Sequence, residues 1–258
     1  YYYLPETKSL QKQGLSIGKE AYQLLYFGQI KDSLNLAKLA VKINKSDEKL
    51  WAILAEAQIA NNLYKDALIS LNNAQRIDPT LGEIYFAKSK LYLNDSKINE
   101  ARNILEKGIK FMPENYRALF QLGNIYLMDK DYKKAIEEFE KAVQIKIDFW
   151  QAINNQGLAY FELDEIDLSI NYFEKAITLE ESAEPLLALA SCLRTQDINT
   201  AILLAKKALV KEPKYVEYDY RKEQLWGEKL QQATEKLFQN TQLQKDISLA
   251  KTKINKTY

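Results

Sequence analysis

Apolar residues recur along most of the chain at the spacing of amphipathic helices. In residues 132–146 they follow the i, i+3, i+4, i+7 pattern, while Lys and Glu occupy the opposite face. Short polar turns separate such stripes at residues 61–62, 94–95, 129–131 and 164–165. These turns contain Asn and Asp, which favour turns and helix starts. The pattern therefore predicts helix, turn, helix units along the chain.

The predicted helices repeat every 34 residues. Frames starting at residue 14 align a column of small residues: Ala21, Ala55, Ser89, Gly123, Gly157 and Ser191. A second column is bulky, with Ile17, Trp51, Tyr85, Leu119, Ile153 and Leu187. Small residues allow two helices to cross closely, and bulky ones fill the space between them. The frames are 14–47, 48–81, 82–115, 116–149, 150–183 and 184–215, the last shortened to 32 residues near its turn.

These columns resemble the tetratricopeptide repeat family, whose period is also 34 residues. The best copy is frame 116–149, with Leu119, Leu122, Gly123, Tyr126, Ala135, Phe139 and Ala142 in the family's columns. Ile147 stands where the family prefers Pro. The resemblance implies an all-α fold, a right-handed superhelical solenoid of stacked antiparallel helix hairpins.

The two ends of the chain fall outside this period. Residues 1–13 form a lead-in to the first repeat. An amphipathic stripe in residues 216–239 predicts a capping helix, which a solenoid needs to cover the stacking face of its last repeat. Residues 240–258 have ragged apolar spacing, and we expect a helical extension or a flexible tail there.

The lead-in begins with Tyr1-Tyr2-Tyr3-Leu4-Pro5 and has no initiator Met. Since aromatic side chains gather at membrane interfaces, one hypothesis is that a removed hydrophobic anchor precedes Tyr1. A trimmed soluble terminus is the equal alternative. The expected location is the cytoplasm, or a membrane with the repeats facing the cytoplasm.

Composition excludes most catalytic chemistry. The chain has no His and one Cys, Cys192, so it lacks imidazole acid–base pairs, thiolate zinc sites and intramolecular disulfides. Lys and Arg number 36 against 35 Asp and Glu, which does not favour nucleic acid. We therefore expect a non-enzymatic protein without cofactor, metal or nucleic-acid ligand. Only chemistry run by carboxylates, Lys or Tyr stays open, and no motif supports it.

The family resemblance implies that the first helix of each hairpin lines a concave groove. Carrying its inward positions onto the third to fifth repeats gives Phe86, Lys90, Asn94, Arg117, Phe120, Gln121, Asn124, Gln151, Asn154 and Asn155. Asn and Gln can pair with a peptide main chain of any sequence. Phe86 and Phe120 would anchor apolar groups, while Lys90 and Arg117 would attract a carboxylate. We predict a protein or peptide partner; the alternative is a solvated helix face without a ligand.

The leading hypothesis is a scaffold for the assembly of a larger complex. Residues 220–227 are similar to tetratricopeptide proteins that assist photosystem assembly in cyanobacteria and plastids, which would place the protein at the thylakoid. The alternative is a structural self-association module, a homo-oligomer formed through the convex face or the C-terminal helix. The sequence leaves the oligomeric state open.

Overall fold

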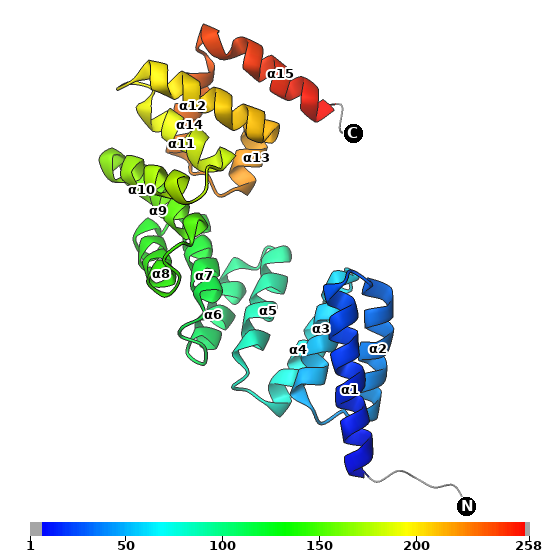
Figure 1. The fold of residues 1–258 in the computed structure, drawn as a ribbon. Coiled ribbons are helices and arrows are strands. Elements are labelled where there is room, and N and C mark those ends of the chain that lie inside the picture. Colours follow the sequence, from blue (N-terminus) through cyan, green and yellow to red (C-terminus); the bar gives the residue numbers. More distant parts are fainter. Residues whose placement is uncertain (1–6, 256–258) are drawn as a thin grey trace, which may run out of the picture. The chain divides into compact units, whose positions relative to one another are not determined.

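The computed structural model describes residues 7–255, and every regular element in this range is a helix. The chain divides into two compact units, one ending at Pro113 and the other beginning at Glu114 (Figure 1). The division falls next to the boundary between the third and fourth repeat frames. The all-α fold class is therefore confirmed, while the tyrosines of residues 1–3 lie outside the described residues.

The first unit contains three helix hairpins. Their helices are α1 (Thr7–Tyr26), α2 (Ile30–Ile43), α3 (Glu48–Ala60), α4 (Tyr64–Ile77), α5 (Gly82–Asn94) and α6 (Ile98–Ile109). Each odd-numbered helix packs on the helix that follows it, and successive hairpins meet through α2 with α3 and α4 with α5. The seven residues before frame 14–47 are part of α1 rather than a separate element.

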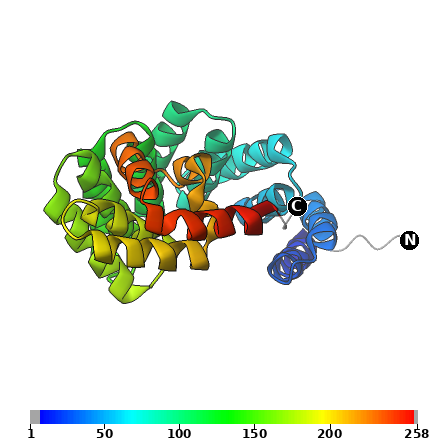
Figure 2. The same cartoon turned by 90° about the horizontal axis from the view of Figure 1, so that it is seen from above.

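The second unit continues with hairpins and then departs from them. Its elements are α7 (Tyr116–Met128), α8 (Tyr132–Ile145), α9 (Trp150–Glu162), α10 (Ile166–Leu179), α11 (Ala183–Leu193), α12 (Ile198–Lys211), the 3₁₀-helix η1 (Pro213–Val216), α13 (Tyr218–Glu223), α14 (Glu228–Phe238), the 3₁₀-helix η2 (Thr241–Leu243) and α15 (Gln244–Asn255). Figure 2 shows α15, in red, running along α12, which it contacts.

The turns inside the hairpins show the 34-residue register in their backbone angles. Residues with positive φ recur at Gly28, Asn62, Ser96, Lys130 and Asp164, each 34 positions after the last. The next amide bonds back across the turn, as Glu165 N does to Tyr160 O at 3.0 Å. A left-handed residue, followed by a hydrogen bond from the next amide to the carbonyl five residues earlier, is a common C-terminal end of an α-helix. The shortened turn of the sixth repeat lacks the left-handed residue.

The column of small residues lies where the two helices of a hairpin cross. A Cβ atom at Gly123 would collide with the ring of Phe139, and one at Gly157 with the ring of Phe173. Both rings are fully buried. Where Ser33, Ser89 or Ser169 stands at the crossing, its hydroxyl donates to a backbone carbonyl of the other helix, as Ser169 Oγ does to Gly157 O at 3.0 Å. The crossing is too close for a larger side chain in either helix.

The C-terminal part, where one capping helix over 216–239 was predicted, holds the short helix α13 and the separate helix α14. The chain turns sharply between them because Leu225 has a φ of +64° and Gly227 passes against the carboxyl group of Glu162. Helix α14 ends at Phe238, and Asn240 then caps η2, with its side chain accepting from Gln242 N at 2.9 Å. Residues 244–255 form α15 instead of continuing the preceding helix.

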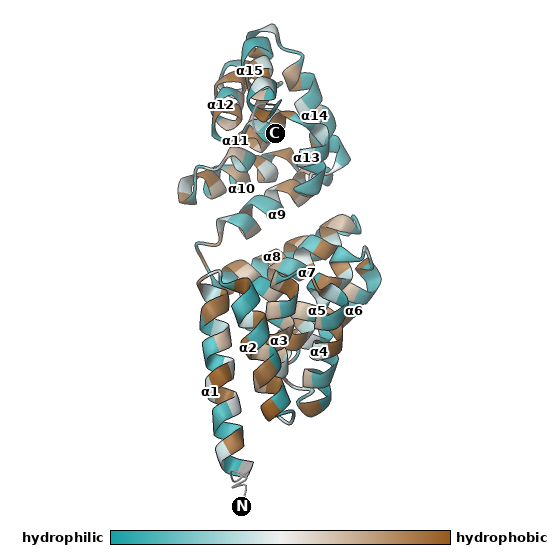
Figure 3. Ribbon diagram, turned by 90° about the vertical axis from the view of Figure 1, so that its right-hand side faces the viewer, coloured by the Kyte–Doolittle hydropathy of each residue, from teal (hydrophilic) through white to brown (hydrophobic). Residues whose placement is uncertain are grey.

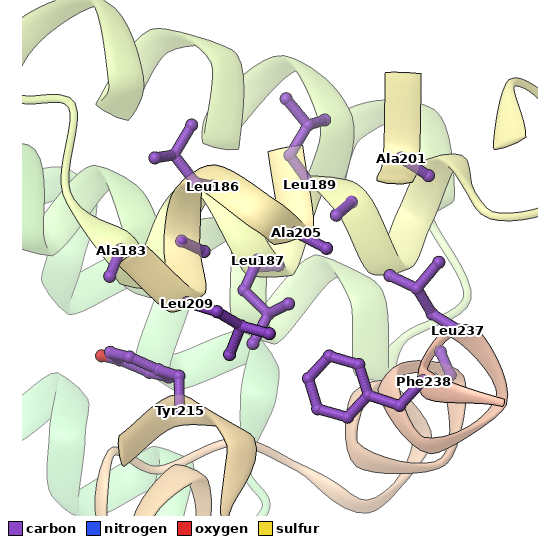
Figure 4. Packing of buried hydrophobic residues seen from close by; sticks show 14 of the residues in the cluster. Ala183, Leu186, Leu187, Leu189, Ala201, Ala205, Leu209, Tyr215, Leu237 and Phe238 are labelled. Carbon is purple, nitrogen blue, oxygen red and sulfur yellow. The ribbon is translucent and has the colours of Figure 1, made fainter. Parts of the chain in front are cut away.

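Helix α11 is the centre of the second unit's core. Nine of its eleven residues are buried, because α10, α12 and α14 each contact it. Figure 4 shows Tyr215, Leu237 and Phe238 approaching the leucines of α11 from the C-terminal segment. In Figure 3 the visible side of α14 is largely hydrophilic, as expected for a helix with one face on this core.

Candidate functional site

The predicted groove residues divide between the two units. Phe86, Lys90 and Asn94 belong to α5 of the first unit. The other seven belong to the second unit, on α7 and α9: Arg117, Phe120, Gln121, Asn124, Gln151, Asn154 and Asn155. The structure gathers four of these seven in one pocket, lined by Phe120, Asn124, Gln151 and Asn155. Arg117 does not line it; its Nε bonds the Tyr116 hydroxyl instead, at 3.2 Å.

The pocket has a volume of about 540 Å³, within the range of small-molecule sites. Helices α7 and α9 form one wall, and the start of α11 and the segment after α12 form the other. The remaining lining residues are Trp150, Ser182, Ala183, Glu184, Glu212, Tyr215, Glu223, Gln224 and Leu225. Five of these nine lie beyond the last helix of the repeats, so the C-terminal segment supplies much of the pocket.

Three asparagine side chains form a chain of hydrogen bonds from the core to the pocket. Asn154 Nδ2 donates to Asn155 Oδ1 at 3.1 Å, and Asn155 Nδ2 donates to Asn124 Oδ1 at 2.8 Å. The side-chain oxygens of Asn155 and Asn124 therefore each accept a hydrogen bond. The NH₂ group of Asn124 remains available as a donor at the pocket. Asn154 is fully buried, and its Oδ1 has no hydrogen-bond partner among residues 7–255.

Aromatic contacts fix the apolar wall of the pocket. The ring centroid of Phe120 lies 4.9 Å from that of Phe149 and 5.7 Å from that of the buried Phe139. Phe149 in turn meets Tyr116 edge to face, with 5.1 Å between centroids. Rings at these separations attract each other and hold one another's orientation. Phe120 therefore presents a positioned apolar surface rather than a mobile one.

Glu184 stands at the junction of the pocket and the core. Its Oε1 accepts a bond from Trp226 Nε1 at 3.1 Å. Burial raises the pKa of Glu184 to about 7, although hydrogen bonding to Trp226, Asn154 and Tyr215 acts in the opposite direction. Burial and the neighbouring Glu184 also raise the pKa of the Tyr215 hydroxyl. The Glu184 carboxyl therefore changes its charge close to neutral pH.

The C-terminal segment is held against α9 by a second carboxylate. Glu162 accepts bonds from the first amides of α14, with Lys229 N at 3.3 Å and Leu230 N at 3.0 Å. A carboxylate at this place satisfies free N–H groups and opposes the positive end of the helix dipole. Lys229 Nζ closes the contact by bonding Glu162 O at 2.7 Å and Asp164 Oδ2 at 2.6 Å.

This docking covers the face of α9 that the family resemblance assigns to the groove. Leu158, Phe161 and Glu162 lie on that face and are buried. On α7 the corresponding face carries the half-buried Phe120 and Asn124. The part of the second unit's groove that remains open is therefore the pocket between α7, α9 and residues 212–225.

Arg221 ties the C-terminal segment together. Its guanidinium is fully buried, bonding Gln231 Oε1 at 2.8 Å, Tyr215 O at 2.7 Å and the carboxylate of Glu235. It also lies 5.4 Å from the ring centroid of Phe238. A buried Arg needs such partners because its desolvation is costly. The arrangement fixes η1, α13 and α14 as one piece, and with them the second wall of the pocket.

Sequence reasoning missed this second wall. Trp226 lies in the amphipathic stripe of 216–239, but its bond to Glu184 joins residues 42 positions apart. The bond between Glu162 and Leu230 joins residues 68 apart. Only the Pro213 and Gly227 breaks signalled that this stretch was not one continuous helix.

Metal and membrane features can be stated for the described range. No group of three or more Asp, Glu, Cys or His side chains in residues 7–255 is placed to hold a metal ion. The three carboxylates that line the pocket are therefore not arranged as a metal site. None of the described helices has the length and apolar character of a membrane span.

Comparison with known proteins supports the repeat assignment. Tetratricopeptide repeat models match residues 82–115, 116–148 and 151–182. No curated protein matches the chain.

Solved structures provide further matches. A crystal structure of MamA is 25% identical, covers 67% of this chain and 93% of its own, and gives a TM-score of 0.58. PilF of Pseudomonas aeruginosa is 18% identical over 85% of this chain and 99% of its own, with a TM-score of 0.70. YrrB, described as a TPR protein with an unusual peptide-binding site, is 15% identical over 79% and 98%, with a TM-score of 0.56. The chain contains tetratricopeptide repeats.

Proposed function

We propose that this protein is a non-catalytic scaffold that binds a segment of a partner protein in the pocket between α7, α9 and residues 212–225. The partner segment lies along α7, where the groove is open, and places one side chain in the pocket. Holding such a segment would bring the partner into a larger complex, which is the role we assign to the scaffold.

The observation that carries this proposal is the Asn124–Asn155 pair at the wall of the pocket. The pair is oriented by the 2.8 Å bond between Asn155 Nδ2 and Asn124 Oδ1, and it lies beside the positioned ring of Phe120. A fixed amide next to an apolar surface suits a peptide, since the amide pairs with the main chain and the ring covers an apolar side chain. The peptide-binding site described for YrrB, a protein of this fold, supports the proposal.

The test uses short random peptides displayed on phage and selected against the full chain. Affinities of the selected peptides are then measured for the wild type, Phe120→Ala and Asn124→Ala. We expect each variant to bind about tenfold more weakly, which is the scale of a central contact in an interface. Phe27→Ala is the matched control, because Phe27 is 74% exposed and belongs to the first unit. Equal binding by wild type and both pocket variants, with unchanged thermal unfolding, would contradict the proposal.

Self-association is the second candidate, and a specific observation favours it. Leu203 and Val210 are 59% and 63% exposed and lie seven residues apart on α12, so they share one face of that helix. Leu249 of α15 is also exposed. Sedimentation of the wild type and of Leu203→Lys/Val210→Lys tests the idea: a wild-type dimer that the double variant abolishes supports it, whereas a wild-type monomer contradicts it.

The narrower expectations remain predictions. None of the matching proteins supports a role in photosystem assembly, and the thylakoid location depends on that role. A membrane anchor before Tyr1 concerns residues outside the described range. Of the complex in which the scaffold would act, we propose only that its partner is recognised through a peptide segment.

A further inference from the structure

We propose that the pocket takes a positively charged side chain, lysine or arginine, from the partner. The inference rests on the proposed function and names the chemistry of the residue that enters. Its basis is the composition and geometry of the pocket wall. The sequence had suggested the opposite preference, since Lys90 and Arg117 were expected to attract a carboxylate.

Charge is the first argument. Glu184, Glu212 and Glu223 line the pocket, and no Lys or Arg does. Across residues 7–255 none of these three carboxylates forms an ion pair with Lys or Arg. Carboxylates accept their strongest hydrogen bonds from cationic donors. A cation that enters the pocket would therefore meet acceptors whose charge is not yet balanced, whereas an acidic side chain would be repelled.

The existing hydrogen bonds leave room for such a donor. Glu212 Oε1 accepts from the backbone amide of Lys214 at 3.2 Å. Glu184 Oε1 accepts from Trp226 Nε1 at 3.1 Å, and the Glu184 carboxyl also bonds Asn154 and Tyr215. Each carboxylate has two oxygens and about four acceptor positions, so these neutral donors do not saturate them. Glu223 lies at the exposed rim, where it can meet a charged group as it enters.

Aromatic rings are the second argument. Phe120, Trp150 and Tyr215 line the same pocket as the carboxylates. The faces of such rings attract ammonium and guanidinium groups, and their surfaces cover the alkyl part of a long basic side chain. The chain itself contains this contact elsewhere, since Lys90 Nζ lies 4.4 Å from the ring centroid of Phe86. Rings and carboxylates together favour an organic cation over a neutral polar group.

The pocket's other features fit an organic cation better than an inorganic one. The carboxylates are not grouped closely enough to hold a metal ion together. The volume of about 540 Å³ leaves space for a long side chain and bound water. Burial holds the pKa of Glu184 at about 7, so a cation nearby would favour its charged form and strengthen the attraction.

The experiment extends the phage selection. The peptides that bind the full chain and lose binding with Asn124→Ala are sequenced, and each Lys or Arg in them is replaced by norleucine. We expect the selected set to be enriched in Lys or Arg, and one such replacement to weaken binding about tenfold. The double variant Glu212→Gln/Glu223→Gln should weaken the basic peptides by a similar factor and leave their norleucine forms unchanged. Glu174→Gln, which removes an exposed carboxylate of α10, is the control.

The outcomes separate this inference from the proposed function. If the pocket-dependent peptides are acidic or neutral, or if the double variant binds basic peptides as well as wild type, the inference is wrong while the pocket still binds peptides. If no peptide depends on either Phe120 or Asn124, the proposed function is contradicted and the inference falls with it. The inference is supported if the selected peptides are enriched in Lys or Arg, and if replacing these residues by norleucine weakens binding to the wild type but not to Glu212→Gln/Glu223→Gln.

Discussion

Helices α7 and α9 occupy the same place in successive repeats, yet their inward faces have different neighbours. On α7, Phe120 and Asn124 remain half-buried at the pocket. On α9, Leu158 and Phe161 are buried under the C-terminal segment, and Glu162 caps its helix α14. The comparison teaches that a repeat position fixes the direction of a side chain but not its partner. Side chains that point inward contact the chain's own C-terminal segment on α9, whereas on α7 they remain at the pocket surface.

The largest expected effect comes from releasing the C-terminal segment, which packs on α9 and so gives α9 a different neighbour from α7. Arg221→Met removes the buried guanidinium that bonds Gln231, the carbonyl of Tyr215 and Glu235. We expect a loss of about 3–5 kcal/mol in the free energy of unfolding, because several buried polar groups lose their partner. Urea denaturation followed by tryptophan fluorescence measures it. The exposed neighbour Lys222→Met should change stability by less than about 0.5 kcal/mol; similar losses for both variants would refute the assigned role of Arg221.

A smaller effect should be equal in the two repeats. Gly123→Ala and Gly157→Ala each place a methyl group against a buried ring, Phe139 in one hairpin and Phe173 in the other. Overpacking of this kind costs about 1–3 kcal/mol. Because the crossing is the same in both hairpins, thermal unfolding should give similar losses. A large difference between the two would show that the C-terminal segment also alters the crossing inside α9 and α10.

Glu162→Gln tests the cap that only α9 provides. The variant keeps a side-chain oxygen for the α14 amides but removes its charge, so we expect a loss of about 1 kcal/mol. Hydrogen exchange of the Lys229 and Leu230 amides should become faster. The exposed Glu137→Gln on α8 is the matched control and should leave both quantities unchanged. Unaltered exchange in Glu162→Gln would mean that the cap does not hold the segment.

The last expected effect is a dependence of folding stability on pH. The folded pKa of Glu184, about 7, exceeds its ordinary value of 4.5, so the folded state binds more protons between these values. Stability should therefore fall as pH rises from about 5 to 8, by about 2–3 kcal/mol if the whole shift of this group is realised. Glu184→Gln should flatten this part of the profile in urea titrations. Glu212→Gln, at the same pocket, is the control, and a slope that persists in Glu184→Gln would exclude Glu184 as its source.

The repeat architecture was predictable because it depends on local spacing. Small residues such as Gly123 and Gly157 mark the helix crossings, and apolar stripes mark the buried faces. The same periodic argument extended to the turns, where left-handed residues follow the 34-residue register from Gly28 to Asp164. These features need only neighbours within a hairpin, so one sequence contains enough information to place them.

The sequence predicted four of the thirteen lining residues of the pocket. Phe120, Asn124, Gln151 and Asn155 were identified from their repeat positions, and the structure places them together. Glu184 and Tyr215 were not, since their place in the pocket depends on a segment that returns to helices far back in the chain. The contacts that fix this return join single residues such as Glu162 and Leu230, and no periodic pattern marks them. Arg221 is fully buried, and no periodic pattern of the sequence marks a charged residue at this position as buried.

Because residues 213–238 pack back onto α9 and α11, the pocket is complete only after this segment has been synthesised. A nascent chain that has emerged from the ribosome as far as Lys211 already contains helices α1 to α12, but it lacks five lining residues of the pocket: Glu212, Tyr215, Glu223, Gln224 and Leu225. The repeats can therefore fold during translation without offering the finished pocket to a partner. Binding at this pocket would therefore require a chain synthesised beyond Leu225, and a chain terminated before that point would be a repeat protein without the complete pocket.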